Sequence, residues 1–156
     1  MSSRIRGAVL ATIMLLPAMA MMRSPAVGAE SSVADARRRE RTTWDSVFSA
    51  AQAERGQATY ARTCQRCHTA TLAGADESPA LAGGAFLSNW SGQSLHVLHD
   101  RILSSMPSDT PGVYTRAEMA DVIAYVLSFN GFPAGASDLP SSSDSLKAIL
   151  LTTVKP

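Results

Sequence analysis

The feature that most constrains this 156-residue chain is the run Cys64-Gln65-Arg66-Cys67-His68. Two thiols three positions apart, followed directly by a histidine, form the C-x-x-C-H pattern in which haem is attached covalently. The thiols can add to the two vinyl groups of one porphyrin, and His68 is then held beneath the iron, where a neutral imidazole is a good ligand. The motif therefore predicts a fold that must supply a pocket for one bound haem.

Two other uses of paired cysteines fit this chain less well. A structural zinc site needs about four cysteine or histidine ligands, and the only two cysteines of the chain are already in this motif. A thioredoxin-like redox pair would follow a strand in an alternating pattern of strands and helices. The Ala-rich surroundings of Cys64 lack that pattern. Haem attachment is therefore the favoured interpretation.

Residues 1–29 have the pattern of a secretory signal peptide. Two arginines precede an apolar stretch over 7–22, and small residues follow it up to Ala29. The stretch contains Pro17 and is shorter than the ~20 apolar residues that a membrane-spanning helix needs. We expect cleavage after Ala29, with Ala20 as a second candidate. The mature chain is then expected to be soluble, periplasmic and without stable membrane insertion.

The charge of the mature chain limits the classes of partner. Loss of residues 1–29 removes three arginines and changes the formal net charge from +1 to about −2. A nucleic-acid partner would require a concentrated basic face, so none is expected. Residues 30–43 carry a run of charges with almost no apolar side chains, which predicts a flexible arm.

A first helix is predicted to begin after Ser49, where Gln52 three residues later fits a capping box, and to run to Thr63. It leads directly into the haem motif. Gly56 lies inside this helix and costs ~1 kcal/mol relative to alanine, which suggests that another backbone passes close to it. Tyr60, one turn later, is expected to face the same neighbour.

The expected neighbour is the last helix. Thr115 and Glu118 form a second capping box, an apolar stripe follows at helical spacing, and Asn130-Gly131 can end the helix. A shorter helix is predicted over 94–105. No alternating strand is found, and the stretch 69–94 is predicted to pack around a haem edge without a helix of its own.

The sixth iron ligand is sought among four residues outside the signal segment. Met106 follows the middle helix and precedes Pro107, which favours an extended loop that can present a side chain. Met119 matches the apolar stripe of the last helix, so we interpret it as a core residue. His96 and His99 stay open as less favoured ligands, since surface histidines are common.

Aromatic residues between the motif and the middle helix are candidates for the haem pocket wall. Phe86, Leu87 and Trp90 lie together there. The ring N–H of Trp90 could donate to a haem propionate, although an ordinary half-buried tryptophan is an equal alternative. Arg101 could also reach a propionate, but a solvated arginine on a helix is the simpler interpretation.

Together these features resemble class I cytochromes c, in particular small bacterial ones found with quinoprotein alcohol dehydrogenases and related respiratory oxidoreductases. The resemblance covers residues 44–139. It rests on Gly56, Tyr60, Cys64-Gln65-Arg66-Cys67-His68, Leu72-Ala73-Gly74, Pro79-Ala80-Leu81-Ala82-Gly83, Phe86, Trp90, Met106-Pro107, Val122-Ile123-Ala124-Tyr125-Val126-Leu127 and Asn130-Gly131-Phe132-Pro133-Ala134-Gly135.

The resemblance implies an all-α fold of three main helices and loops around one covalently bound haem c. It implies thioether bonds at Cys64 and Cys67, axial ligation by His68 and Met106, and a Pro79 carbonyl that accepts a hydrogen bond from the His68 ring. Where the family often has glycine after the motif histidine, this chain has threonine at position 69, so the local turn is expected to differ.

A carrier of single electrons, not an enzyme, is the expected function, because two filled axial positions leave no site for a substrate on the iron. The expected partners are a donor such as a quinoprotein dehydrogenase and an acceptor such as an oxidase or another cytochrome. A haem enzyme or ligand-binding protein with a labile sixth ligand stays open, as does a tightly bound subunit of a dehydrogenase. Residues 140–156 are predicted to be a tail that covers the domain or stays mobile, with 141–145 as linker.

Overall fold

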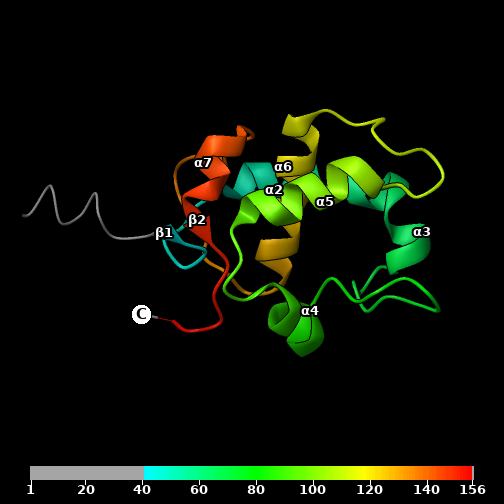
Figure 1. Ribbon diagram of the computed structural model, residues 1–156, viewed down its shortest axis with the longest axis horizontal. Helices are drawn as coiled ribbons and strands as arrows, with labels where there is room; N and C mark the ends of the chain where they lie inside the picture. Colours follow the sequence, from blue (N-terminus) through cyan, green and yellow to red (C-terminus); the bar gives the residue numbers. More distant parts are fainter. Residues whose placement is uncertain (1–40, 156) are drawn as a thin grey trace, which may run out of the picture. The chain divides into compact units, whose positions relative to one another are not determined.

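The computed structural model describes residues 41–155, and the predicted signal peptide and most of the predicted arm lie outside them. The described part is mostly helical, which confirms the predicted all-α class (Figure 1). Its elements in chain order are β1 (Arg41–Thr42), α2 (Ala50–Thr63), α3 (Gln65–His68), α4 (Gly83–Trp90), α5 (Leu95–Ser105), α6 (Arg116–Phe129), α7 (Ser143–Lys147) and β2 (Ile149–Leu150). Within this part of the chain, no helix has the length and apolar character needed to cross a membrane.

Helices α2 and α6 cross at Gly56, as predicted. A Cβ atom on Gly56 would lie 1.8 Å from the carbonyl oxygen of Asp121, so only glycine permits this backbone approach. One turn later the Tyr60 ring packs against the Tyr125 ring of α6, with 5.2 Å between ring centroids. This contact fixes the end of α2 that leads into the haem motif.

The capping box of α6 is present in both directions. The Thr115 hydroxyl accepts from the Glu118 N–H at 3.2 Å, and the Glu118 carboxylate accepts from the Thr115 N–H at 2.8 Å. The helix ends before Gly131, whose φ of +83° is the left-handed conformation that glycine favours. Both predicted ends of this helix are confirmed.

Only half of the predicted capping box of α2 forms. The Ser49 hydroxyl accepts from the Gln52 N–H at 3.0 Å. The Gln52 side chain, however, is buried and exchanges two hydrogen bonds with the backbone of Leu139, at 3.1 and 2.6 Å. A buried amide must satisfy both its donor and its acceptor, and the Leu139 backbone offers both.

The stretch 69–94 contains a helix, so the prediction of none was wrong. Helix α4 places Phe86 and Trp90 one turn apart on the same face, with 6.4 Å between their ring centroids, and Phe86 is 1% exposed. Two glycines at its start suggested a loop. Burial of Phe86 against the rest of the fold outweighs that local preference.

The ends of the described chain also differ from the prediction. Strand β1 pairs in parallel with β2, and Thr43, assigned to the flexible arm, is fully buried. Helix α7 begins inside the predicted linker 141–145 and buries Leu146 completely. Of the two alternatives for the tail, the structure therefore shows the covering one. Two-residue strands are too short to produce an alternating pattern in the sequence.

Candidate haem site

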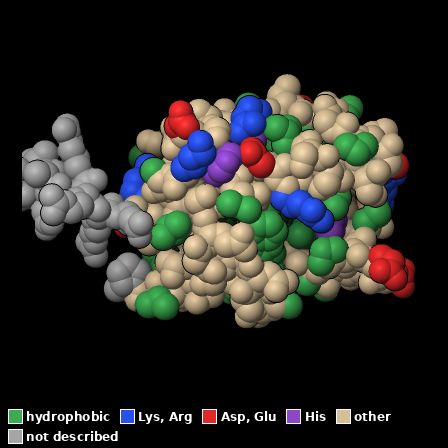
Figure 2. Space-filling model, viewed as in Figure 1, with side chains coloured by type: hydrophobic (Ala, Val, Ile, Leu, Met, Phe, Trp, Pro, Cys, Tyr) green, Lys and Arg blue, Asp and Glu red, His purple; other side chains and the backbone are tan. Residues whose placement is uncertain are grey.

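The Cys64 motif opens onto a cavity of about 760 Å³. This volume lies within the ~300–1,000 Å³ typical of ligand and cofactor pockets. Figure 2 shows apolar side chains gathered near the centre of this face, between α5 and α4. The lining comes from the motif, the loop before α4, helices α4, α5 and α6 and the loop after α5, and includes Cys64, Cys67, His68, Pro79, Leu81, Phe86, Trp90, Leu98, Arg101, Ile102, Met106, Val122, Ile123 and Val126.

The two cysteines lie at the two ends of one short turn. Cys64 follows α2 and is half-buried, whereas Cys67 lies in α3 and is exposed. Burial raises the pKa of the Cys64 thiol. A redox-active pair needs a thiolate that is stabilised, so this environment does not favour the thioredoxin-like alternative. It is compatible with thiols that are consumed by covalent attachment.

The His68 ring is held in one orientation and one tautomer. Its Nδ1 atom lies 2.9 Å from the Pro79 carbonyl oxygen. A carbonyl can only accept, so Nδ1 carries the proton, and in the neutral ring Nε2 keeps its lone pair. The residue is 8% exposed and lines the cavity. His68 is therefore prepared to bind a metal ion through Nε2.

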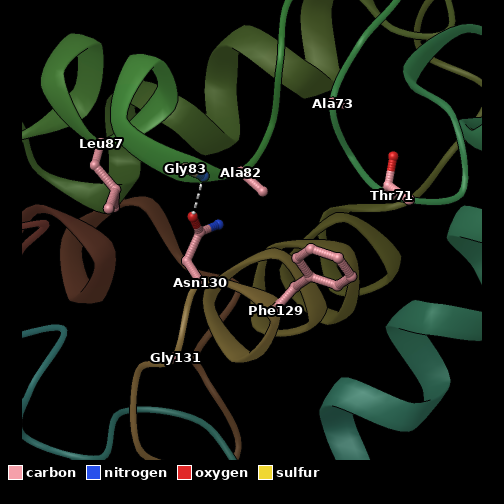
Figure 3. Close-up of a pocket in the computed structure, with 8 residues that line it drawn as sticks. All are labelled: Thr71, Ala73, Ala82, Gly83, Leu87, Phe129, Asn130 and Gly131. Carbon is pink, nitrogen blue, oxygen red and sulfur yellow. Dashed lines mark hydrogen bonds between the residues drawn. The ribbon is translucent and has the colours of Figure 1, made fainter.

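Asn130 holds the loop that carries Pro79, a role that the sequence did not reveal. Its side-chain oxygen accepts from the Gly83 N–H at 3.0 Å (Figure 3). Its amide donates to the carbonyls of Leu81 and Val126 at 3.0 and 2.8 Å. The loop is thus fixed to the end of α6. The sequence indicated only that Asn130 ends a helix, because nothing local places it beside residues 81–83.

A second pocket, of about 560 Å³, lies around these contacts (Figure 3). Leu87, which was predicted to belong to the haem pocket wall, lines this second pocket and not the haem cavity, so that prediction was wrong. Phe86 and Trp90 lie one turn apart on one face of α4 and line the haem cavity, whereas Leu87 follows Phe86 directly and lies on another face. The eight residues that line the second pocket include no titratable side chain and are Thr71, Ala73, Ala82, Gly83, Leu87, Phe129, Asn130 and Gly131. The second pocket therefore offers no acidic or basic side chain and no histidine, cysteine or methionine to bind an iron.

Met106 lies in the same cavity as His68. It directly follows α5 in an extended conformation, with φ −125° and ψ 144°, and lines the cavity together with Pro107 and Ser108. This is the loop geometry expected from the Met106-Pro107 sequence. Met119, in contrast, is 2% exposed in the core and does not line the cavity.

Neither of the two alternative histidines lines the cavity. His99 is fully buried, and its Nε2–H donates to the Arg116 carbonyl at 2.9 Å. His96 hydrogen bonds to the Ser143 hydroxyl at 3.2 Å. Both rings thus contact the start of α6 or of α7. Of the four candidate sixth ligands, only Met106 shares a cavity with His68.

Trp90 and Arg101 lie at the cavity with their polar groups available. Trp90 is half-buried, and among residues 41–155 no hydrogen-bond acceptor is found for its ring N–H. Arg101 is exposed and forms no ion pair within the same residues. Both side chains could therefore donate to an anionic group inside the cavity.

Thr69 keeps the backbone conformation that glycine would adopt. Its φ is +63° and its ψ is 165°, a region that is essentially restricted to glycine. The Thr69 carbonyl accepts from the Tyr60 hydroxyl at 2.7 Å. Burial raises the pKa of Tyr60, so this hydroxyl stays protonated and able to donate. Thr69 thus holds a backbone conformation that favours glycine, and the expected difference from the family's turn stays a prediction.

The residues around the cavity fit a haem c group. They include two thiols, one imidazole with a free Nε2 atom, one thioether and an apolar wall. Such a set of donors matches the known ligation of haem iron by histidine and methionine. It does not match a structural zinc site, and no cluster of three or more metal-binding side chains occurs among the described residues.

Comparison with known families agrees with this chemistry. The family model described as cytochrome C oxidase, cbb3-type, subunit III matches residues 51–126, which contain the motif and most of the cavity wall. No curated protein and no solved structure matches the chain. The fold is the all-α class I cytochrome c fold, and the family match supports a class I cytochrome c. A cytochrome c domain carries covalently bound haem c, for which Cys64 and Cys67 are present, and functions in electron transfer.

Proposed function

We propose that this protein carries single electrons between partner proteins in the periplasm through one covalently bound haem c. Cys64 and Cys67 would hold the haem through thioether bonds, and His68 and Met106 would bind its iron. One observation carries the proposal: His68 and Met106 line the same cavity, whereas His96, His99 and Met119 do not. When bound, haem c supplies a one-electron couple between ferric and ferrous iron.

The residues around the cavity determine the ligation and the reduction potential of the haem iron. The Pro79 carbonyl holds the Nδ1–H of His68 and directs Nε2 into the cavity. The Met106 thioether favours the ferrous form relative to a second imidazole and so raises the reduction potential. With both ligands in place, neither peroxide nor a small gas has an open position, which separates a carrier from a haem enzyme.

We assign Trp90 to the propionate side of the haem. Trp90 lines the cavity, and no acceptor for its ring N–H is found among the described residues, so this group is free to donate to a propionate. Arg101 is a second donor at the same cavity. Two donors to the propionates would orient the haem in addition to the thioether bonds.

The proposed partners are redox proteins that meet the exposed haem edge through a weak, transient interface. The description of the matched family names a subunit of an oxidase, which makes an oxidase a candidate acceptor. A quinoprotein dehydrogenase is a candidate donor, on the basis of the sequence resemblance alone. The periplasmic location is supported by the signal-peptide pattern of residues 1–29.

Carbon monoxide binding to the ferrous protein tests the proposal. We expect the wild-type protein to bind it slowly and the Met106→Ala variant to bind it rapidly, because the variant has an open axial position. Met119→Leu is the matched control. It replaces a buried methionine by a leucine of similar volume, at a position that does not line the cavity. Rapid binding by the wild-type protein would instead indicate a ligand-binding protein or haem enzyme.

A further inference from the structure

The loop of residues 107–114, which we call the Met106 loop, begins directly after Met106 and leads from the end of α5 to the start of α6. In Figure 1 it is the yellow segment that passes beside α3. None of its residues belongs to the buried core, and Val113 is 62% exposed. Burial of apolar side chains therefore contributes little to its position.

Backbone hydrogen bonds contribute little as well. The Thr110 N–H donates to the Pro107 carbonyl at 3.0 Å, which closes a turn inside the loop. Among residues 41–155, no backbone–backbone hydrogen bond joins residues 107–114 to another element. The position of the loop must then depend on its side chains.

Two side-chain contacts join this loop to the region of the haem motif. The Arg66 guanidinium donates to the Asp109 carboxylate at 2.6 Å, and the hydroxyls of Tyr114 and Thr63 form a hydrogen bond. Thr63 and Arg66 lie on either side of Cys64. Within residues 41–155, these are the two hydrogen-bonded contacts from residues 107–114 to another element.

We propose that Arg66 and Tyr114 are positioning residues that hold the Met106 loop across the haem cavity and thereby slow the release of Met106 from the iron. Arg66 is a variable position of the C-x-x-C-H pattern, so the pattern itself gives it no role. The inference rests on the proposed ligation by Met106. It adds that the covalent attachment site and the sixth ligand are mechanically connected through side chains of this chain.

The expected effect is modest for Arg66 and larger for Tyr114. A ligand enters at a rate proportional to the fraction of molecules with an open loop, when the loop closes faster than the ligand binds. The Arg66–Asp109 pair is about half exposed at both ends, so its removal should raise the entry rate about two- to five-fold. Loss of the Tyr114 hydroxyl bond, which is half-buried, should raise it about two- to ten-fold.

The test measures the rate of carbon monoxide binding to the ferrous holoprotein in Arg66→Gln and Tyr114→Phe. Arg55→Gln is the matched control for the first, because Arg55 is similarly exposed and its partners Asp121 and Asp138 lie outside this loop. Tyr125→Phe is the control for the second, since no hydrogen bond of its hydroxyl is found among the described residues. Thermal unfolding of each holoprotein measures general destabilisation beside the rate.

Faster entry in Arg66→Gln and Tyr114→Phe, with wild-type rates in both controls, would support the proposal. Exchange of the two charges in Arg66→Asp combined with Asp109→Arg should restore a rate near wild type. The advantage of the wild type over Arg66→Gln should also shrink at high salt, because exposed ion pairs are screened. A positioning role requires that the double exchange restores the rate. If the residues were only structural, the rate of carbon monoxide binding in each variant would instead change in parallel with its unfolding temperature.

Equal rates in wild type and both loop variants would overturn the proposal, as would equal acceleration by Arg55→Gln. Met106→Ala distinguishes this failure from failure of the proposed function. If Met106→Ala binds carbon monoxide no faster than the wild type, the ligand assignment itself is wrong and the inference falls with it. If Met106→Ala is fast and the loop variants are not, only the positioning role is wrong.

Discussion

Single residues set the backbone geometry next to the haem motif. Thr69 follows His68 directly and has a φ of +63°, which a β-branched residue adopts only under strain. Its carbonyl is held by the Tyr60 hydroxyl, and Tyr60 packs on α6. The surrounding contacts therefore impose a conformation that the residue itself does not favour, and the turn after the motif stays in place.

Replacement of Thr69 by glycine should stabilise the protein. Relief of the strained backbone favours the variant, while the greater freedom of glycine in the unfolded chain opposes it, so we expect a net gain of about 1 kcal/mol in the free energy of unfolding. Denaturant unfolding of the holoprotein measures this gain.

Thr71→Gly provides the control, because the hydroxyls of Thr69 and Thr71 contact each other at 3.2 Å and both variants lose that contact. Thr71 has no positive φ. We therefore expect Thr71→Gly to lose stability. A loss in Thr69→Gly as well would show that the backbone at this position is not strained.

At the scale of elements, local capping interactions define the helix that forms one wall of the cavity. The N-terminus of α6 is closed by Thr115 and Glu118, each bonded to the backbone of the other. The hydrogen bond from the Thr115 N–H holds the pKa of the Glu118 carboxyl below its usual range. A negative charge in this first turn also interacts favourably with the helix dipole.

This lowered pKa predicts a pH dependence of stability. A carboxyl with a depressed folded-state pKa stabilises the protein above its unfolded pKa, near 4.3, and the contribution is lost as the pH falls through the folded value. Glu118→Gln keeps the capping geometry but removes the charge. We expect it to lose about 0.5 kcal/mol at neutral pH, and this difference from wild type should vanish in acid.

Unfolding measured from neutral pH down to about pH 3 checks this expectation. Glu54→Gln is the control, because Glu54 is exposed on α2 and no hydrogen bond of its side chain is found in the described part of the chain. For Glu54→Gln, the difference from wild type in the free energy of unfolding should not shrink in this way as the pH falls. A difference for Glu118→Gln that stays constant into acid would contradict the role of the charge.

At the scale of the described molecule, the two ends of residues 41–155 close the side of the fold where β1 and β2 pair. Leu146, Ile149 and Leu151 are each at most 1% exposed. The Leu151 backbone bonds to Gly92 and Gln93, just before α5, at 2.8 and 2.9 Å. The C-terminal segment is thus part of the core, although none of it lines the haem cavity.

Leu146→Ala should therefore destabilise the whole fold. Truncation of a fully buried leucine costs about 2–5 kcal/mol, because it leaves a cavity in the core. The visible spectrum of the folded variant should stay unchanged, since Leu146 is not part of the haem site. Val154→Ala, at a residue that is 72% exposed, should change stability by less than about 0.5 kcal/mol. Equal small effects would contradict a structural role for the segment.

What could be predicted from the sequence depended on the range of the interactions. The boundaries of α6 follow from its caps, which act within a few residues. The crossing at Gly56 follows from a glycine inside a helix, which costs free energy of helix formation and therefore indicates a close neighbour. The positions of His68 and Met106 at one cavity also agree with the motif and with the Pro107 loop. Ligation by Met106 itself stays a prediction.

The features that the sequence did not reveal depend on partners far along the chain. Helix α4 is stabilised by burial of Phe86, and the Asn130 side chain bonds to residues 81–83 across the fold. Thr43 is buried because β1 pairs with a strand more than a hundred residues away. No local pattern encodes such contacts, so composition alone made these segments resemble loops.

The most direct test of the central claim is the near-infrared spectrum of the ferric protein. The account predicts a weak charge-transfer band from methionine sulfur to ferric iron in the wild type, and its complete loss in Met106→Ala. A wild-type protein that binds haem but lacks this band, or a Met106→Ala variant that keeps it, would contradict ligation by Met106 and with it the proposed electron carrier.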